Sequence, residues 1–134
     1  MIHRLELASK TESISKVELL IEEVCKEFSI GEEGYGNILI AVTEAVNNAI
    51  THGNQSNENK KVHLAYQSIS NEISFTVTDQ GNGFDYENVP DPTLPENILK
   101  ENGRGVFLMK CLADEIAFED KGKSINLKFR LTGS

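Results

Sequence analysis

Cysteine and histidine are scarce in this chain, and neither residue type forms a cluster. The two cysteines, Cys25 and Cys111, are far apart, both stand in apolar contexts, and there is no Cys-x-x-Cys pair. The three histidines are too scattered to form the ligand pattern of a zinc site. We therefore expect two buried free thiols that act as small hydrophobic residues, and neither a disulfide nor a zinc site.

Positive charge is also in short supply. The chain has 13 lysines and arginines against 21 aspartates and glutamates, so its formal net charge is −8. Nucleic acids are bound by clustered lysines and arginines, so this balance argues against direct contact with nucleic acid. An anionic small ligand would have to be bound by backbone N–H groups, a divalent cation and a few well-placed basic side chains.

A long apolar run is missing as well. No stretch approaches the roughly 20 apolar residues that span a bilayer, and residues 1–6 lack the apolar core of a signal peptide. We therefore expect a cytoplasmic protein without membrane contact. The 134 residues, of which 39% are hydrophobic and 25% charged, suit one globular domain at residues 1–134 with a single core.

The periodicity of the apolar residues predicts the order of the secondary-structure elements. Three-four spacing favours helices, and alternation between strong turn signals favours strands. The expected elements are a strand at 2–8, helices at 13–28 and 32–51, strands at 62–66 and 73–77, a helix at 103–112, and strands at 115–118 and 125–131. This order places helices on one face of a mixed, mainly antiparallel sheet, which is a two-layer α/β sandwich of the α+β class.

Two details of the helix ends follow from residue preferences. Thr11 or Ser13 should cap the first helix, because a side-chain hydroxyl can accept a hydrogen bond from the first turn. Gly53 suits the left-handed residue that commonly follows a helix end. The core stripe of that second helix should consist of Ile38, Val42, Ala45 and Ala49.

The second helix carries a carboxylate and a carboxamide four residues apart. Glu44 and Asn48 project from the same face of a helix, within an otherwise apolar pattern. Such a pair suits a magnesium-phosphate site, in which one group accepts a proton and the other holds a hard cation through oxygen. Asn47 lies about 100° further round the helix and points elsewhere. The alternative is a helix whose polar residues face solvent.

Two glycine-containing segments follow. Asp79 ends a strand and is followed by Gly81 and Gly83, while Gly103 and Gly105 open an amphipathic helix. A glycine-rich helix start presents N–H groups and a favourable dipole to phosphates. Taken alone, the Asp79 segment is better explained as an ordinary turn, and a lone Gly-x-Gly is common in turns.

These three segments, in this order and at these separations, resemble the N, G1 and G2 boxes of the GHKL ATPase superfamily. That superfamily includes histidine kinases and gyrase-type ATPases. The wording Glu-Ala-Val-x-Asn-Ala-Ile-x-His-Gly, from Glu44 to Gly53, looks most like the anti-sigma factor serine kinases of the RsbW and SpoIIAB type. The resemblance covers residues 2–131.

The resemblance implies roles for individual residues. Glu44 would be the general base that activates a protein serine or a water, and Asn48 would bind Mg²⁺. Asp79 would accept a hydrogen bond from the exocyclic amine of adenine, with Gly81 and Gly83 letting the backbone pass close to the ring and sugar. The phosphates would meet Gly103 and Gly105, and residues 85–102 would form the ATP lid.

Two positions depart from the pattern of the relatives or leave a choice open. Some relatives carry an arginine just ahead of the first glycine of the G2 box, where this chain has Glu101 and Asn102. A phosphate role for Arg104 or Lys100 is therefore open. Ser124 stands where relatives have a glycine and a threonine beside the adenine-binding aspartate, and it is equally a turn residue entering the last strand.

The implied cofactors are ATP and Mg²⁺, and the implied partners are a sigma factor and an anti-anti-sigma protein of the STAS type. The chain would then be a serine/threonine kinase that sequesters the first and phosphorylates the second. The oligomeric state is left undecided between a monomer and a homodimer, because relatives form dimers. Two alternatives remain: a non-catalytic, nucleotide-gated protein-binding regulator of the same fold, and a detached histidine kinase catalytic domain acting in trans.

Overall fold

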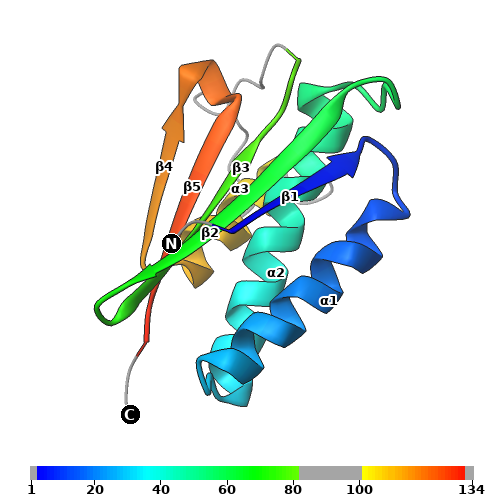
Figure 1. Cartoon of the computed structure of the whole chain (residues 1–134). Helices are drawn as coiled ribbons and strands as arrows, with labels where there is room; N and C mark the ends of the chain where they lie inside the picture. Colours follow the sequence, from blue (N-terminus) through cyan, green and yellow to red (C-terminus); the bar gives the residue numbers. More distant parts are fainter. Residues whose placement is uncertain (1–2, 82–100, 132–134) are drawn as a thin grey trace.

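The chain folds into a five-stranded sheet with helices on one face (Figure 1). The computed structural model describes residues 3–81 and 101–131. Its elements are β1 (His3–Ala8), α1 (Ser13–Glu27), α2 (Glu32–Asn48), the π-helical turn η1 (Ala49–Gly53), β2 (Lys61–Ile69), β3 (Glu72–Thr78), α3 (Glu101–Leu112), β4 (Glu115–Glu119), the 3₁₀ turn η3 (Asp120–Gly122) and β5 (Ser124–Arg130).

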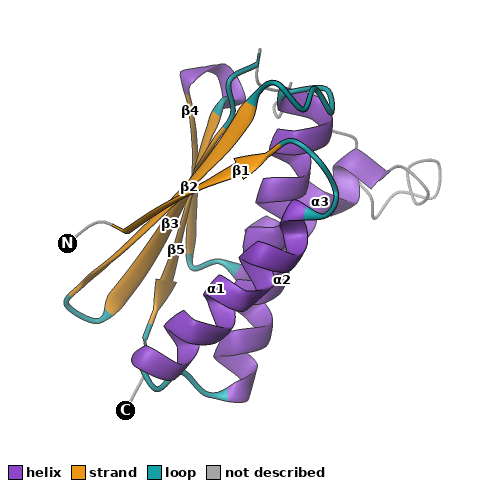
Figure 2. Ribbon diagram, turned by 45° about the vertical axis from the view of Figure 1, so that its right-hand side comes forward, coloured by secondary structure: helices purple, strands orange, loops and turns teal. Residues whose placement is uncertain are grey.

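The strand order in the sheet is β1-β2-β3-β5-β4, and every neighbouring pair is antiparallel. Figure 2 shows the sheet from its edge, with α1, α2 and α3 on the same side of it. The predicted element order and the two-layer α+β architecture are therefore confirmed. The sheet, expected to be mixed or mainly antiparallel, is wholly antiparallel in the described residues.

The hydrophobic core lies between the sheet and the helices. Alternate residues of the central strands are buried: Val62, Leu64 and Tyr66 in β2, Ile73, Phe75 and Val77 in β3, and Ile125, Leu127 and Phe129 in β5. The helices cover them with Val17, Ile21 and Val24 of α1 and with the predicted α2 stripe of Ile38, Val42, Ala45 and Ala49. Strand alternation and helical spacing thus specify the same buried layer.

The predicted cap of α1 is wrong. The residue before the helix is Glu12, whose side chain makes no capping hydrogen bond. Ser13 begins the helix instead, and its hydroxyl donates to the Ala8 carbonyl at 2.7 Å. Ser13 therefore fastens the helix start to the end of β1, and does not satisfy the N–H groups of the first turn.

The second helix ends differently from the prediction. Its α-helical part stops at Asn48, and η1 continues to Gly53, with the Asn54 N–H donating to the Ala49 carbonyl at 2.8 Å. The left-handed residues after the helix are Gln55 and Ser56, with φ of 52° and 56°, so the prediction for Gly53 is wrong. A single π turn of this kind changes the direction in which the following residues point, and such turns are frequent at functional sites.

Two smaller predictions also need correction. The third helix begins at Glu101, two residues before Gly103, so Gly105 falls in its second turn. Cys25 is buried as expected, and its burial raises the pKa of its thiol, but Cys111 is exposed on α3. Among the described residues, no helix is both long enough and apolar enough to cross a bilayer.

The β2–β3 hairpin offers a matched test of the packed face. Ile73 is fully buried, whereas Ile69 at the other side of the turn is 61% exposed. Ile73→Ala should lower the free energy of unfolding by about 2–5 kcal/mol through lost burial and a cavity, while Ile69→Ala should change it by less than about 0.5 kcal/mol. Urea denaturation measures both, and equal losses would contradict the assignment of the buried face.

Candidate functional site

The first part of the site lies where α2 packs against α3. Glu44 is half-buried and Asn48 is 4% exposed, and both approach Gly105 of α3. A β-carbon at Gly105 would lie 2.8 Å from Glu44 Oε2, 3.5 Å from Asn48 Nδ2 and 3.6 Å from Asn48 Oδ1. Glycine therefore lets α3 approach both polar side chains, and the structure brings together residues of the predicted N and G2 boxes.

The Asn48 carboxamide is buried with an incomplete set of hydrogen bonds. Its Nδ2 atom has no hydrogen-bond partner within the part of the chain that the structure describes. Burying such a group costs about 1–3 kcal/mol. A buried amide that lacks a partner within the protein is a candidate for contact with a ligand. Asn47, by contrast, is exposed, as its position on the helix predicted.

The second part of the site surrounds Asp79, which is only 5% exposed. Its Oδ1 atom accepts a hydrogen bond from the Gly81 N–H at 2.8 Å. A β-carbon at Gly53 would collide with the Asp79 carboxylate, and one at Gly81 would collide with the Gly53 carbonyl. Because these two residues are glycines, the backbone of η1 and that of the turn after β3 can both pack against the buried Asp79 carboxylate. The end of the predicted N box therefore lies beside the predicted G1 box.

The edge of β5 fixes the backbone of Asp79 from the other side. The Asp79 N–H donates to the Lys123 carbonyl at 2.9 Å. The Ser124 hydroxyl lies 3.3 Å from the hydroxyl of Thr78, its partner in the β3–β5 register. Ser124 is therefore close to Asp79 along the sheet, and its hydroxyl pairs with Thr78. Its contact with a ligand stays a prediction.

Several predicted residues lie wholly or partly outside this description. Gly83 and most of the predicted lid, residues 85–102, fall outside the described residues, apart from Glu101 and Asn102 at the start of α3. Gly103 and Arg104 lie in α3, near the helix start where N–H groups have no partner within the helix. The Arg104 side chain lies outside what the structure describes, so its contact with phosphate stays a prediction.

Sequence reasoning missed a buried asparagine beside the site. Asn54 is 1% exposed and contacts Ser9, Lys61 and Gln80 through hydrogen bonds. It begins a polar run that contains two further asparagines, both exposed, at positions 57 and 59. Composition identifies this run as a loop, and nothing in it distinguishes the buried asparagine from the exposed ones.

Comparison with known proteins decides the family. The model of the histidine kinase-like ATPase domain family matches residues 7–129, which is most of the chain. The chain belongs to this family. Membership of this ATPase domain family implies that the chain binds ATP.

The relatives of this ATPase domain include serine-protein kinases. A protein of Staphylococcus epidermidis named serine-protein kinase RsbW is 30% identical over 92% of the chain and 82% of that relative. A protein of the same name from Oceanobacillus iheyensis is 24% identical over 87% of the chain and 78% of that relative. The chain is therefore a homologue of the RsbW kinases along most of its length.

A solved structure confirms the fold. The RsbU and RsbW domains of a Mycobacterium tuberculosis protein match with a TM-score of 0.71 at 16% identity. The match covers the whole of this chain and 33% of the other, so the chain spans about a third of that protein's length. The histidine kinase-like ATPase fold expected from the sequence is thus shown.

The site contains few groups that bind a metal. Among the described residues, no cluster of three or more histidine, cysteine, aspartate or glutamate side chains is arranged to hold a metal ion. Mg²⁺ typically keeps several waters and takes only one or two protein ligands alongside the oxygens of a substrate phosphate. The Asn48 carboxamide fits that requirement through its oxygen, which is a hard ligand. Its Nδ2 atom is buried without a partner among the described residues.

The unpartnered amide gives a prediction about stability. Asn48→Leu keeps a similar volume and removes a buried polar group, so the ligand-free protein should be as stable as the wild type or more stable, by up to about 1–3 kcal/mol. Asn47→Leu on the exposed side of the same helix should stay within about 0.5 kcal/mol. Thermal and urea denaturation of the two variants measure this. A loss of more than about 2 kcal/mol for Asn48→Leu would show that the asparagine is structural.

Proposed function

We propose that this chain is an ATP-dependent serine/threonine protein kinase that binds a sigma factor and phosphorylates an anti-anti-sigma protein of the STAS type. The observation that carries the kinase proposal is the contact of Gly105 with both Glu44 and Asn48. In this proposal Glu44 is the proton acceptor and Asn48 the oxygen ligand, and both adjoin the helix whose start suits a phosphate group. The names of the RsbW relatives support a protein serine as the acceptor.

The adenine end of the nucleotide would lie at Asp79. A buried carboxylate is costly unless it is hydrogen-bonded, and Oδ1 already accepts the Gly81 N–H. A carboxylate has acceptor capacity for several hydrogen bonds, and one of them would come from the exocyclic amine of adenine. A base without that donor would lose this hydrogen bond to a buried charged acceptor, which is the basis of selection against it.

The phosphate end would lie between α2 and α3. The first turn of α3, which includes Gly103, offers N–H groups and the positive end of a helix dipole to an anion. When bound, Mg²⁺ would neutralise charge on the phosphates, with Asn48 as its protein ligand. The acidic balance of the chain makes these backbone and metal contacts necessary, because few basic side chains are present.

Glu44 would act on the acceptor serine. Its carboxylate would take the proton of the serine hydroxyl while the oxygen attacks the γ-phosphorus in line with the departing ADP oxygen. The hydroxyl O–H bond and the bond from γ-phosphorus to the bridging oxygen break, and a phosphoserine ester forms. Half-burial of Glu44 in the interface with α3 holds the carboxylate in place without removing it fully from solvent.

The kinase proposal is tested by separating chemistry from binding. Glu44→Gln keeps the volume but removes the proton acceptor, so transfer of labelled phosphate to a partner serine should fall by about 10²-fold or more while ATP still binds. Glu33→Gln, an exposed change in the first turn of the same helix, is the matched control and should keep the wild-type rate. A phosphorylation assay is run beside calorimetry on each variant.

Each outcome of this test has a clear meaning. If the wild type forms a complex with its partner and binds ATP but transfers no phosphate, the nucleotide-gated binding regulator becomes the better account. If Glu44→Gln transfers at the wild-type rate, the base lies elsewhere. Label on an acid-labile histidine of the partner would instead favour a histidine kinase acting in trans.

A further inference from the structure

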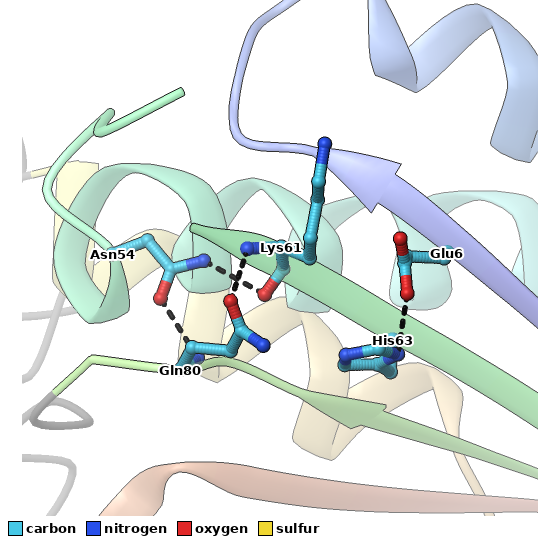
Figure 3. A network of polar contacts seen from close by, with 5 residues as sticks. All are labelled: Glu6, Asn54, Lys61, His63 and Gln80. Atoms are coloured by element: carbon cyan, nitrogen blue, oxygen red, sulfur yellow. Dashed lines mark hydrogen bonds and ion pairs between the residues drawn. The ribbon is translucent and has the colours of Figure 1, made fainter. Parts of the chain in front are cut away.

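A buried hydrogen-bond network adjoins the turn that carries Asp79. Figure 3 shows its centre, the Asn54 side chain between Lys61 and Gln80. Asn54 Oδ1 accepts the backbone N–H of Gln80 at 2.8 Å, and Asn54 Nδ2 donates to the Lys61 carbonyl at 3.0 Å. Nδ2 also donates to the Ser9 hydroxyl at 2.7 Å. One amide therefore connects the end of η1 to the start of β2, the end of β1 and the residue next to Asp79.

The Gln80 side chain closes the network from the opposite direction. Its Oε1 atom accepts the backbone N–H of Lys61 at 2.6 Å (Figure 3). Both backbone groups of Lys61 are thus bound by the two amide side chains, while its own side chain extends away from them. The Ser9 hydroxyl in turn donates to the Lys60 carbonyl at 2.7 Å. We call Asn54 and Gln80, with the Lys61 backbone, the amide clamp.

The amide clamp determines where the turn after β3 lies. Gln80 stands between Asp79, whose carboxylate accepts the Gly81 N–H, and Gly81, whose Cα packs against the Gly53 carbonyl. The clamp holds the backbone N–H of Gln80, and the carbonyl of Lys123, just before β5, holds the N–H of Asp79. The backbone on either side of the Asp79 side chain is therefore fixed, which limits the directions in which its carboxylate points.

The π turn η1 makes this arrangement possible. The Asn54 N–H donates to the Ala49 carbonyl, so Asn54 is itself held by the last turn before it. The clamp is buried at Asn54, which like its partner Ser9 is 1% exposed, and it is open to solvent at Gln80. Buried, fully satisfied amide networks specify one geometry, because any displacement leaves a polar group without a partner.

We propose that Asn54 and Gln80 are positioning residues that set the adenine preference of the site by fixing the direction of the Asp79 carboxylate. This inference rests on the proposed nucleotide function. Neither residue needs to touch the ligand. If Asn54 and Gln80 only stabilise the fold, replacing them weakens the binding of all nucleotides equally, because only the folded fraction changes. If they position Asp79, replacing them lowers the preference for a base that donates from an exocyclic amine.

The experiment compares ADP with inosine diphosphate, in which a carbonyl oxygen replaces that amine. Calorimetry on the full chain gives the two dissociation constants and their ratio. The wild type should favour ADP by about tenfold or more, the worth of one hydrogen bond from the amine to a charged carboxylate. Gln80→Ala removes the acceptor for the Lys61 N–H and should lower the ratio by about threefold or more. Gln80→Glu keeps an acceptor oxygen and should retain most of the wild-type ratio.

Asn54→Ala should lower the ratio further than Gln80→Ala, because it removes three hydrogen bonds. The matched control is Asn126→Ala, which removes a 2.8 Å hydrogen bond to the Thr76 hydroxyl elsewhere on the sheet and should leave the ratio unchanged. If Asn54→Ala does not fold, the comparison of Gln80→Ala with Gln80→Glu decides the question. Gln80 is exposed, so neither of these changes disturbs a buried site.

The outcomes separate this inference from the function on which it rests. A wild type that binds neither diphosphate overturns the proposed function. A wild type that binds both equally leaves nucleotide binding intact but overturns the inference, because Asp79 then does not select the amine. A wild type that prefers ADP, with the same ratio in Gln80→Ala and in any folded Asn54→Ala, also overturns it and makes the clamp a structural feature.

Discussion

The candidate site depends on the absence of a β-carbon at three positions. Gly53 and Gly81 let two backbone segments close on the Asp79 carboxylate, and Gly105 lets α3 close on Glu44 and Asn48. Any larger residue must move a carboxylate or separate the elements that carry it. Because cores are close-packed, such a shift would spread into the layer between sheet and helices. The same contacts thus bring the polar groups together and constrain the packing of α2, α3 and β3.

The polar groups of the site are buried at the ends of elements that are otherwise apolar. The stripe of α2 and the inner face of β3 form the core, and Asn48 and Asp79 continue these elements into the site. Among the described residues, Asn48 Nδ2 has no hydrogen-bond partner, and burial of such a group is destabilising. The apolar core therefore supplies the stability, and the proposed ligand would offer this amide a partner.

Much of the fold could be predicted because it depends on local periodicity. The stripe of Ile38, Val42, Ala45 and Ala49 and the alternation of β2, β3 and β5 each specify a buried face without reference to other elements. That Glu44 and Asn48 lie on the same face of the helix, both beside Gly105, was likewise predictable in part from their four-residue spacing. The π turn was not predictable. It differs from an α-helix in the spacing of its backbone hydrogen bonds, and no residue type specifies that spacing.

The remaining misses share a physical cause. Ser13 forms a hydrogen bond with Ala8, and Asn54 forms hydrogen bonds with residues up to 45 positions away. Residue preferences for helix caps and loops carry no information about such contacts. Exposure of Cys111 likewise depends on which side of α3 faces the sheet. For this reason, resemblance to the ATP-binding boxes indicated the candidate site, whereas the hydrogen-bond network beside it became visible only in three dimensions.

The most direct test of a site built on these glycines uses protein labelled with ¹⁵N in its ten glycines. Addition of ADP with Mg²⁺ should shift the amide resonances of Gly53, Gly81 and Gly105, which border the two polar clusters. Gly36 lies twelve residues before Asn48 in α2, about 18 Å along the helix, and its resonance should stay in place. Saturating shifts at the first three glycines are the predicted result. Shifts confined to Gly36, or binding that leaves Gly53, Gly81 and Gly105 unchanged, would contradict the account.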